Sequence, residues 1–406
     1  MKILLVHKFF YVTGGAEIFF FETARILKEN GHEIAFFSTK NKLNKKTKYE
    51  RYFVKPPKFD LTNIGQIIYS KKAKQRFAYL LDDFKPNIVH VFGIFSHISP
   101  SILETAKERQ IPVVMSCNDY KHICPNYKLF HHGELCEKCR GKKFYQAILN
   151  KCCHNSITYS VASATESWIQ EKTNMVRKNV DLFLFASDFM AKKTELFWGK
   201  NSFKWQKLVN PIKINHLKNT AEIGDYILFF GRLIEEKGVK ELLLTMKNLP
   251  KIKLIVVGGG PEKNILEKTK KELSIKNVEF VGEKWGEEMK EIIRKSRIVV
   301  VPSRWYENFP YVIIQAFMMG KPVVATKLGG IPELVKKQFG ILYDPQKEGA
   351  LARAINYLWQ RPQNCLKRGK AARKYIEKEF VDEIFYKNLM NIYNGCLSSN
   401  KKLRYN

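Results

Sequence analysis

The chain has 406 residues, of which 45% are hydrophobic and 27% are charged, and its formal net charge is +31. This length suits two domains of about 200 residues, and the composition excludes a disordered or fibrous protein. No apolar run approaches the ~18 residues of a membrane-spanning helix. The short apolar run in "MKILLVHKFF" is typical of a first buried strand and not of a secretory signal. We therefore expect a cytoplasmic protein.

The first half of the chain alternates apolar strands with helical segments. Gly14 and Gly15 lie in a loop between the first strand and a helix over 18–28. Several strands are continuous apolar runs, which indicates a parallel sheet that is buried on both faces. This alternation predicts a doubly wound α/β domain. The predicted strands are "KILLVH" (2–7), "EIAFFST" (33–39), "PNIVHVFG" (86–93) and "IPVVMSC" (111–117).

Basic residues are in excess in both halves, which favours polyanionic partners such as nucleic acid, anionic lipid headgroups or phosphorylated substrates. The densest stretch is 40–58, with eight basic residues against Glu50 alone. We expect a solvated surface loop here, and contact with an anionic membrane surface or an acceptor is the alternative. Nucleic acid is the less favoured partner because the basic residues lack aromatic interleaving.

Six of the eight cysteines fall within an insertion of about residues 117–155. Structural disulfides are rare in the cytoplasm, whereas a C-x₂-C pair with flanking cysteines is typical of a tetrahedral zinc site. The spacing predicts a structural zinc that ties down the insertion, with reduced buried thiols or an iron–sulfur cluster as alternatives. The predicted ligands are Cys124, Cys136, Cys139 and Cys152.

The strand–helix pattern starts again after an irregular segment between Leu208 and Gly224. We therefore predict two Rossmann-like doubly wound domains over 1–210 and 211–385 that face a central cleft, with a helical tail at 386–406. The second domain's predicted strands are "YILFFG" (226–231), "KLIVVGGG" (253–260), "VEFVG" (278–282), "RIVVVPS" (297–303) and "KPVVAT" (321–326).

Three features of the second half indicate an anion site at the carboxyl ends of its strands. Arg232 and Lys237 follow a strand with four residues between them, so two cations can converge on a diphosphate. The glycines around Gly259 follow another strand and allow close approach of the backbone.

The third feature is the stretch "SRWYENFPYVIIQAFMMGKP" (303–322). Glu307 lies on the loop, and Pro310 suits the first turn of the helix that follows. Asn308 and Phe309 would therefore lie at a helix N-terminus, where unpaired N–H groups favour anions. A carboxylate beside an anion site suits a ligand that carries hydroxyl groups next to phosphate.

These pieces resemble the family 4 retaining glycosyltransferases of the GT-B fold. The resemblance rests on "GRLIEEKGV", "VVGGGPE", "ENFPYVIIQAFMMGKPVVAT" and "GGIPELV", which occur in the family's order over most of residues 225–345. In the first half it rests on "GGAE", "NIVHVFGIFSHISPSIL" and "NDYKHICPNYKL". The cysteine-rich insertion is expected to mark a subgroup.

The resemblance implies transfer of a hexose from a UDP- or GDP-sugar to a saccharide or lipid-linked acceptor, with retained anomeric configuration. Arg232 and Lys237 would stabilise the leaving diphosphate, and Glu307 would contact hydroxyls of the donor sugar. The Arg–Lys pair and the helix end can take the part that Mg²⁺ has in other phosphate chemistry, so we expect no catalytic metal. The remaining donor-binding positions would be Gly14, Gly15, Gly259, Asn308, Phe309, Pro310 and Gln315.

Two positions depart from the family pattern. Gln315 stands where a glutamate usually holds the ribose, which weakens the hydrogen bonds without removing an acceptor. Asn118 stands where a histidine usually lies near the reacting centre, and it cannot carry a proton. His97 and Asp119 are the predicted acceptor-side residues, and His97 or His122 could partly replace the missing histidine.

Two other classes of function compete with this interpretation. A non-catalytic polyanion-binding protein on the same scaffold is favoured by the charge and by the two departures. A nucleotide-sugar epimerase also uses two such domains, although the stretch from Glu307 to Gln315 fits it less well. We expect a glycosyltransferase of surface polysaccharide or glycolipid synthesis.

Overall fold

The computed structural model describes residues 1–58, 63–213 and 222–404, with side chains as far as residue 399. The contacts divide the chain into two compact units. Unit 1 comprises residues 1–129, 136–213 and 382–406, and unit 2 comprises 130–135 and 214–381. Residues 214–221, which belong to the irregular segment predicted between the domains, lie outside the described residues.

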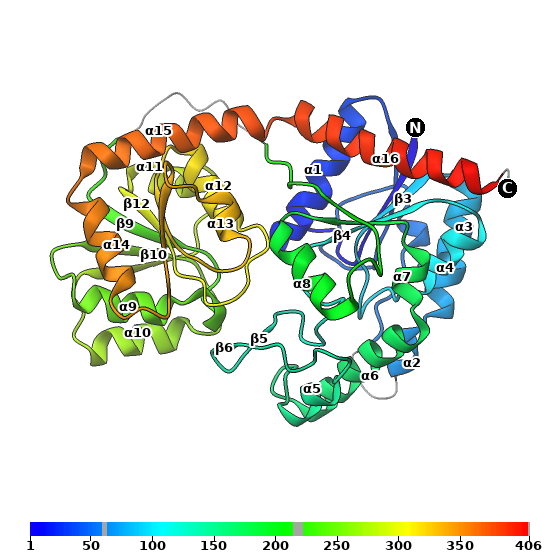
Figure 1. The fold of residues 1–406 in the computed structure, drawn as a ribbon, viewed down its shortest axis with the longest axis horizontal. Coiled ribbons are helices and arrows are strands. Elements are labelled where there is room, and N and C mark those ends of the chain that lie inside the picture. Colours follow the sequence, from blue (N-terminus) through cyan, green and yellow to red (C-terminus); the bar gives the residue numbers. More distant parts are fainter. Residues whose placement is uncertain (59–62, 214–221, 405–406) are drawn as a thin grey trace. The chain divides into compact units, whose positions relative to one another are not determined.

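Unit 1 is built on a six-stranded, all-parallel sheet in the order β2-β1-β3-β4-β7-β8, with helices on both faces (Figure 1). Its central strands are buried along nearly their whole length, as the continuous apolar runs predicted. The strands are β1 (Lys2–His7), β2 (Glu33–Phe37), β3 (Ile88–Gly93), β4 (Val113–Cys117), β7 (Leu182–Phe185) and β8 (Trp205–Lys207).

Nine helices of the described residues belong to unit 1, and several begin at a serine whose hydroxyl accepts a backbone N–H of the first turn, as at Ser70 and Ser187. A 3₁₀ turn also lies at Glu50–Tyr52, within the basic segment. The helices are α1 (Gly15–Glu29), α2 (Ile64–Ile68), α3 (Lys71–Phe84), α4 (Ser101–Glu108), α5 (Tyr145–Leu149), α6 (Ile157–Thr173), α7 (Met175–Asn179), α8 (Asp188–Trp198) and α16 (Asp382–Arg404).

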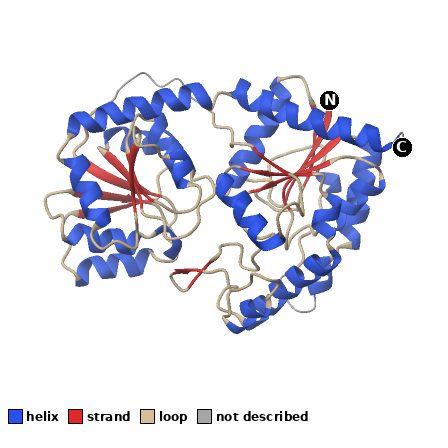
Figure 2. Ribbon diagram, viewed as in Figure 1, coloured by secondary structure: helices blue, strands red, loops and turns tan. Residues whose placement is uncertain are grey.

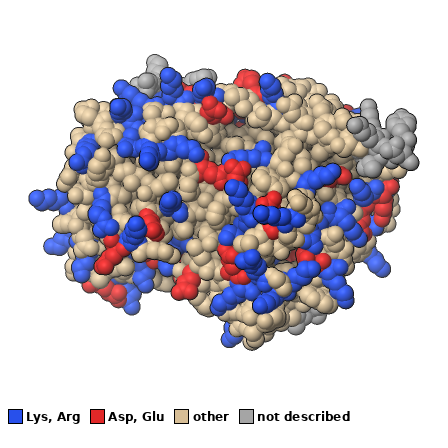
Figure 3. Space-filling model, in the orientation of Figure 1, with Lys and Arg blue, Asp and Glu red and all other residues tan. Residues whose placement is uncertain are grey.

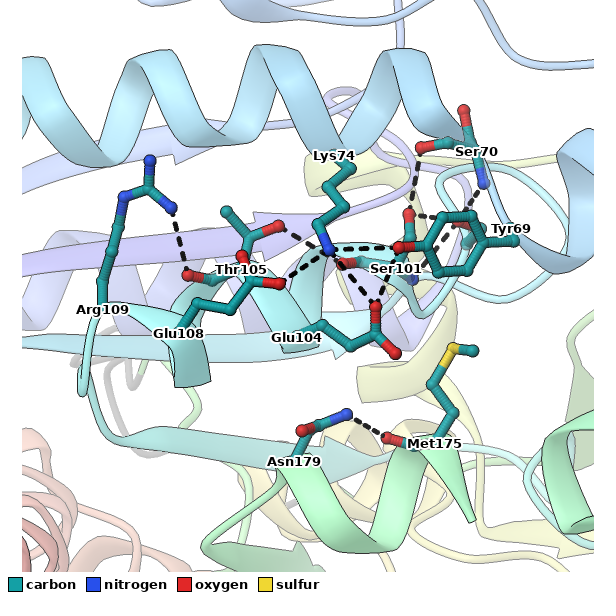
Figure 4. Close-up of polar contacts among 11 residues, drawn as sticks. Tyr69, Ser70, Lys74, Ser101, Glu104, Thr105, Glu108, Arg109, Met175 and Asn179 are labelled. Atoms are coloured by element: carbon teal, nitrogen blue, oxygen red, sulfur yellow. Dashed lines mark hydrogen bonds and ion pairs between the residues drawn. The ribbon is translucent and has the colours of Figure 1, made fainter. Parts of the chain in front are cut away.

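Polar side chains fasten α3 to α4 (Figure 4). The Lys74 ammonium donates to Glu108 at 2.8 Å and to Tyr69 at 3.1 Å, and it lies 3.4 Å from Glu104. The pKa of Lys74 is raised by the hydrogen bond to Glu108 and by the neighbouring phenol and carboxylates. These contacts hold two helices together and supply no catalytic group.

The last helix, α16, belongs to unit 1 although it ends the chain. His90 on β3 forms hydrogen bonds with Tyr393 of α16 at 2.7 Å and with Ser116 of β4 at 2.8 Å, and both rings are buried. Arg25 on α1 donates to Asp382 at 2.8 Å. The residues predicted as a tail therefore continue a helix that packs on the first sheet.

Unit 2 has a second all-parallel sheet in the order β11-β10-β9-β12-β13-β14, and helices cover both of its faces (Figure 2). Its apolar core includes the buried faces of α9 and α14 together with strands β9, β10 and β12. The strands are β9 (Tyr226–Phe230), β10 (Lys253–Val257), β11 (Val278–Gly282), β12 (Ile298–Val301), β13 (Val323–Thr326) and β14 (Gly340–Tyr343).

The helices of unit 2 connect these strands in sequence and include a 3₁₀ turn at Glu235–Lys237. They are α9 (Val239–Lys247), α10 (Lys263–Glu272), α11 (Gly286–Lys295), α12 (Tyr311–Met318), α13 (Ile331–Leu334), α14 (Ala350–Trp359) and α15 (Pro362–Glu379). A small antiparallel hairpin from the cysteine-rich insertion, β5 (Phe130–His131) and β6 (Glu134–Leu135), is grouped with this unit.

The predicted fold class is confirmed, since each unit is a Rossmann-like parallel sheet. All nine predicted strands are present, and the sequence patterns missed three strands of the parallel sheets, β7, β8 and β14, and both strands of the hairpin, β5 and β6. β8 is a polar segment of three residues, and β7 and β14 have only four residues each. Such short runs do not establish a period.

Candidate active site

The order of the strands indicates where each unit binds ligands. In unit 2 the order reverses between β9 and β12, and in unit 1 between β1 and β3. Ligands of open α/β sheets bind outside the carboxyl ends of the strands at such a switch point. The loops after β9 and β12 carry the predicted residues from Arg232 to Lys237 and from Glu307 to Pro310.

An ion pair between a buried carboxylate and a partly buried ammonium joins these two loops. The Lys237 ammonium lies 2.6 Å from Glu307 Oε1, and the Ser303 hydroxyl donates to the same oxygen at 2.8 Å. Burial alone raises the pKa of Glu307, but the ammonium of Lys237 and the hydroxyl of Ser303 outweigh it and hold this pKa below its usual value. Glu307 is therefore an ionised carboxylate at neutral pH. It accepts hydrogen bonds and is not a proton donor.

Arg232 lies on the same loop as Lys237 but is placed differently. Its side chain is exposed, and it has no hydrogen-bond or ion-pair partner in the part of the chain that the structure describes. A guanidinium without a protein partner keeps all its donors for a ligand, and its fork matches a diphosphate. The structure thus brings an unpaired cation and a paired cation to one loop.

The loop after β12 leads into α12. Glu307, Asn308 and Phe309 are buried, and Pro310 caps the helix with an extended backbone. We predicted Pro310 in the first turn of this helix. In the structure the helix begins one residue later, at Tyr311. Gln315 is the fifth residue of α12, about one turn from the Glu307 loop, and it is exposed on the helix surface. The Gln315 side chain is therefore accessible to a ligand.

Glycines let the loops of this site pack directly on one another. Gly258 has φ +143°, and a Cβ there would lie 1.9 Å from the carbonyl oxygen of Gly231. Gly329 has φ +59°, and a Cβ there would lie 2.4 Å from the carbonyl oxygen of Glu307. The next residue, Gly330, donates its N–H to that same carbonyl at 2.6 Å. The "GGIPELV" motif therefore holds the backbone of Glu307, and Gly258 in "VVGGGPE" supports the loop of Arg232.

In unit 1, the predicted donor loop lies at the start of α1. Gly14 is exposed and extended, and Gly15 begins the helix. Glu17 in the first turn is buried and accepts hydrogen bonds from Thr13, through its hydroxyl at 2.7 Å and its backbone N–H at 3.3 Å. Glu17 was not among the predicted site residues, although it is the glutamate of the "GGAE" motif.

His7, at the end of β1, lies 3.6 Å from Glu17. Burial lowers the pKa of His7 to about 3, so its ring is neutral at physiological pH. The contact with Glu17 is accordingly not an ion pair there. Both side chains fix the backbone that leads to Gly14 and Gly15.

The predicted acceptor-side residues follow β3 and β4. Asn118 donates to the Phe92 carbonyl at 3.3 Å, and Asp119 accepts the backbone N–H of Lys121 at 2.9 Å. Burial, with Lys8 nearby, lowers the pKa of His97 to about 4, so His97 does not hold a proton at neutral pH. Its ring packs edge-on against Phe9.

His122 cannot replace the missing histidine at position 118. Its Nε2 forms a hydrogen bond with the Thr194 hydroxyl of α8 at 2.8 Å, and its ring packs against Trp198. Burial lowers its pKa to about 4. His122 therefore belongs to the packing of α8.

The cysteine insertion brings the predicted zinc ligands near one another. Burial, together with the neighbouring cysteines, raises the pKa of Cys124 to about 11 and that of Cys152 to about 12. Within the described residues, however, no three His, Cys, Asp or Glu side chains are arranged to hold a metal ion. The side chains as placed do not fit zinc, and all eight cysteines are free thiols. Zinc binding stays a prediction for elemental analysis.

Comparison with known proteins identifies the two units. Residues 13–202 match the Glycosyltransferase Family 4 domain, and residues 214–375 match the domain described as glycosyl transferases group 1. Between them these matches leave only short segments of the chain unassigned.

Two relatives match over most of their length. A Klebsiella pneumoniae protein, described as an uncharacterized 42.6 kDa protein in the cps region, is 28% identical over 82% of this chain and 87% of its own. The O-antigen chain mannosyltransferase C of Escherichia coli is 21% identical over 98% of this chain and 100% of its own. Among solved structures, Anabaena HepE in complex with UDP-glucose has a TM-score of 0.65 at 17% identity, over 97% of this chain and 100% of that one. This likeness shows a shared fold.

Proposed function

Because this chain belongs to the GT-B glycosyltransferases, we propose that it transfers a hexose from a nucleotide-sugar to a saccharide or lipid-linked acceptor of a surface polysaccharide or glycolipid. The observation that carries the proposal is the ion pair of Lys237 with Glu307 at the β9–β12 switch point, beside the unpaired Arg232. The relatives encoded in a cps region or acting on O-antigen chains support the class of product.

The proposed mechanism follows from the charges at this switch point. Cleavage of the glycosyl–phosphate bond leaves negative charge on the departing diphosphate and positive charge on the sugar. Arg232 and Lys237 stabilise the diphosphate electrostatically, and the first-turn N–H groups of α12 add to that field. Glu307 accepts hydrogen bonds from hydroxyls of the donor sugar. The donor is a UDP- or GDP-sugar, and the anomeric configuration is retained.

The test is turnover by the purified full-length chain with UDP-glucose, UDP-galactose, UDP-N-acetylglucosamine and GDP-mannose. We expect slow release of nucleoside diphosphate with one of them, faster release with an acceptor, and an α-linked product from an α-linked donor by NMR. An epimerised nucleotide-sugar, or failure of UDP and GDP to bind by calorimetry, would refute the proposal.

We also propose that unit 1 contacts an anionic membrane surface through the loop 40–48. This loop exposes five lysines, and Leu43 lies among them with 69% of its surface exposed. Each lysine near an anionic bilayer contributes about 1 kcal/mol of attraction, and an exposed leucine adds apolar contact. On the face shown in Figure 3, basic and acidic side chains are interspersed. None of the described helices is long and apolar enough to cross a membrane.

Flotation with phosphatidylglycerol vesicles tests this contact. We expect wild-type protein to float and the variant Lys42→Glu/Lys46→Glu to remain behind, whereas the control Lys367→Glu/Lys370→Glu on α15 floats like wild type. Equal flotation with neutral phosphatidylcholine vesicles would contradict the electrostatic contact.

A further inference from the structure

Glu166 on α6 is a buried carboxylate with no part in the chemistry proposed above. Glu166 is 0% exposed to solvent. Hydrogen-bond donors surround its carboxylate. Ser96 donates to it twice, from its backbone N–H at 3.0 Å and from its hydroxyl at 3.1 Å. Lys121 lies 2.9 Å away on the other side, and Gln170 donates at 3.3 Å. A buried charge with this many partners is fully compensated.

Among the described ion pairs, Lys121 is the only cation that pairs with Glu166. Lys121 is also buried, with 9% of its side chain exposed. Besides its contact with Glu166, its ammonium donates to the Pro125 carbonyl at 2.9 Å. Its backbone N–H donates to Asp119 at 2.9 Å. The Lys121 side chain therefore connects Pro125, in the loop that follows β4, to Glu166 on α6, and the contact with Asp119 uses the backbone alone.

Two of the partners of Glu166 lie on loops that follow different strands of the sheet. Ser96 lies on the loop after β3, next to His97, and Lys121 lies on the loop after β4, two residues from Asp119. Ser96 has φ 63°, in the left-handed region that residues other than glycine rarely adopt. Its two hydrogen bonds to Glu166 compensate for this backbone conformation.

We propose that Glu166 and Lys121 are positioning residues that lock the two acceptor-side loops into one geometry. Neither touches the reacting atoms. They act through Ser96 and through the Pro125 carbonyl on the loops that present His97, Asn118 and Asp119. This inference rests on the proposed function in one respect, namely that these loops receive the acceptor. The clamp itself is a property of unit 1 alone.

A purely stabilising role explains the cluster less well. Buried ion pairs rarely stabilise a protein more than apolar residues of the same volume would, but they select one arrangement of the groups around them. Here that arrangement includes a backbone N–H and a hydroxyl of a strained residue. Leucine or methionine could fill the same volume but could not fix Ser96.

The experiment measures hydrogen–deuterium exchange of peptides spanning 94–99 and 118–124 in the full-length protein. The variants are Glu166→Gln, Lys121→Met and the double variant, with Arg109→Met, which breaks the surface pair with Asp82, as the matched control. Lys121→Met should speed exchange at 94–99 about tenfold or more, although the described hydrogen bonds and ion pairs of Lys121 do not reach that loop. The double variant should exchange more slowly than either single variant, because it leaves no unpaired buried charge.

A second readout separates positioning from stability. In the single variants we expect transfer to the acceptor to fall about ten- to a hundredfold, while donor hydrolysis by water and UDP binding by calorimetry change less than about twofold. The inference is overturned if exchange increases only in the mutated loop, or if transfer stays at the wild-type rate while both loops exchange faster. A wild-type protein that turns over no donor refutes the proposed function, and the exchange of the two loops still decides whether the clamp exists.

Discussion

The ammonium of Lys237 lies 2.6 Å from Oε1 of Glu307, and the two residues come from loops that follow different strands, β9 and β12. Lys237 and Glu307 were predicted to have separate roles, and they lie 70 residues apart in the sequence. The cation expected at the diphosphate is also the partner of the carboxylate expected at the sugar. An ammonium has three donors, so Lys237 can hold both and set the distance between them.

Glu307→Gln should therefore impair both catalysis and stability. The amide leaves Lys237 without its counter-charge, and we expect the free energy of unfolding to fall by about 2 kcal/mol. Loss of a charge fixed at the reacting centre should lower turnover by about 10²- to 10³-fold. Urea unfolding and nucleoside diphosphate release measure the two effects. The control is Glu287→Gln, which breaks the exposed pair with Lys290 on α11 and should change neither quantity.

The pH dependence of stability offers a second test of this pair. The pKa of Glu307 is lowered in the folded protein, so its contribution is present above the ordinary carboxyl pKa of about 4.3. It is lost as the pH falls through the lowered folded-state pKa. The stability difference between wild type and Glu307→Gln should be constant from about pH 7 to about pH 5 and shrink below about pH 4. A difference that grows towards acid would show that Glu307 is protonated in the folded state.

Arg232→Ala should separate ligand binding from folding. The guanidinium is exposed and has no partner among the described residues, so the free energy of unfolding should change by less than about 0.5 kcal/mol. Nucleotide binding should weaken about tenfold or more through loss of a bidentate phosphate contact. Calorimetry with UDP and GDP measures this. Lys247→Ala, which removes an exposed cation at the other end of α9, should bind as wild type does, and equal weakening there would indicate a diffuse charge effect.

The sequence predicted those features that are encoded locally. The strands β9 to β13 of unit 2 were identified because each is an apolar run, and Arg232 and Glu307 because each lies on the loop after such a run. The Lys237–Glu307 pair was not predicted, since 70 residues separate its members and only the order of β9 and β12 brings them together. The same holds for Ser96 and Glu166, which are also 70 residues apart.

At the missed positions, the residue type alone is also compatible with several roles. A glutamate within a helical segment is normally read as a solvated side chain, and nothing local shows that Glu166 is buried. His122 was judged by its place in a motif, whereas its role is set by α8, which packs against it. The cysteine spacing indicated the composition of a metal site but could not give the directions in which the thiols point. Side-chain direction is a tertiary property.

Gln315→Glu should strengthen donor binding. Gln315 is exposed on α12, so a charge placed there remains solvated and the free energy of unfolding should stay within about 0.5 kcal/mol of wild type. If this side chain holds the ribose, a carboxylate accepts the hydroxyls more strongly than an amide does, and affinity should rise about fivefold to tenfold. Calorimetry with UDP and with uracil separates the ribose contact from the base contact. Equal affinity of both proteins for UDP, or weaker binding by the variant through repulsion of the diphosphate, would place the ribose away from position 315.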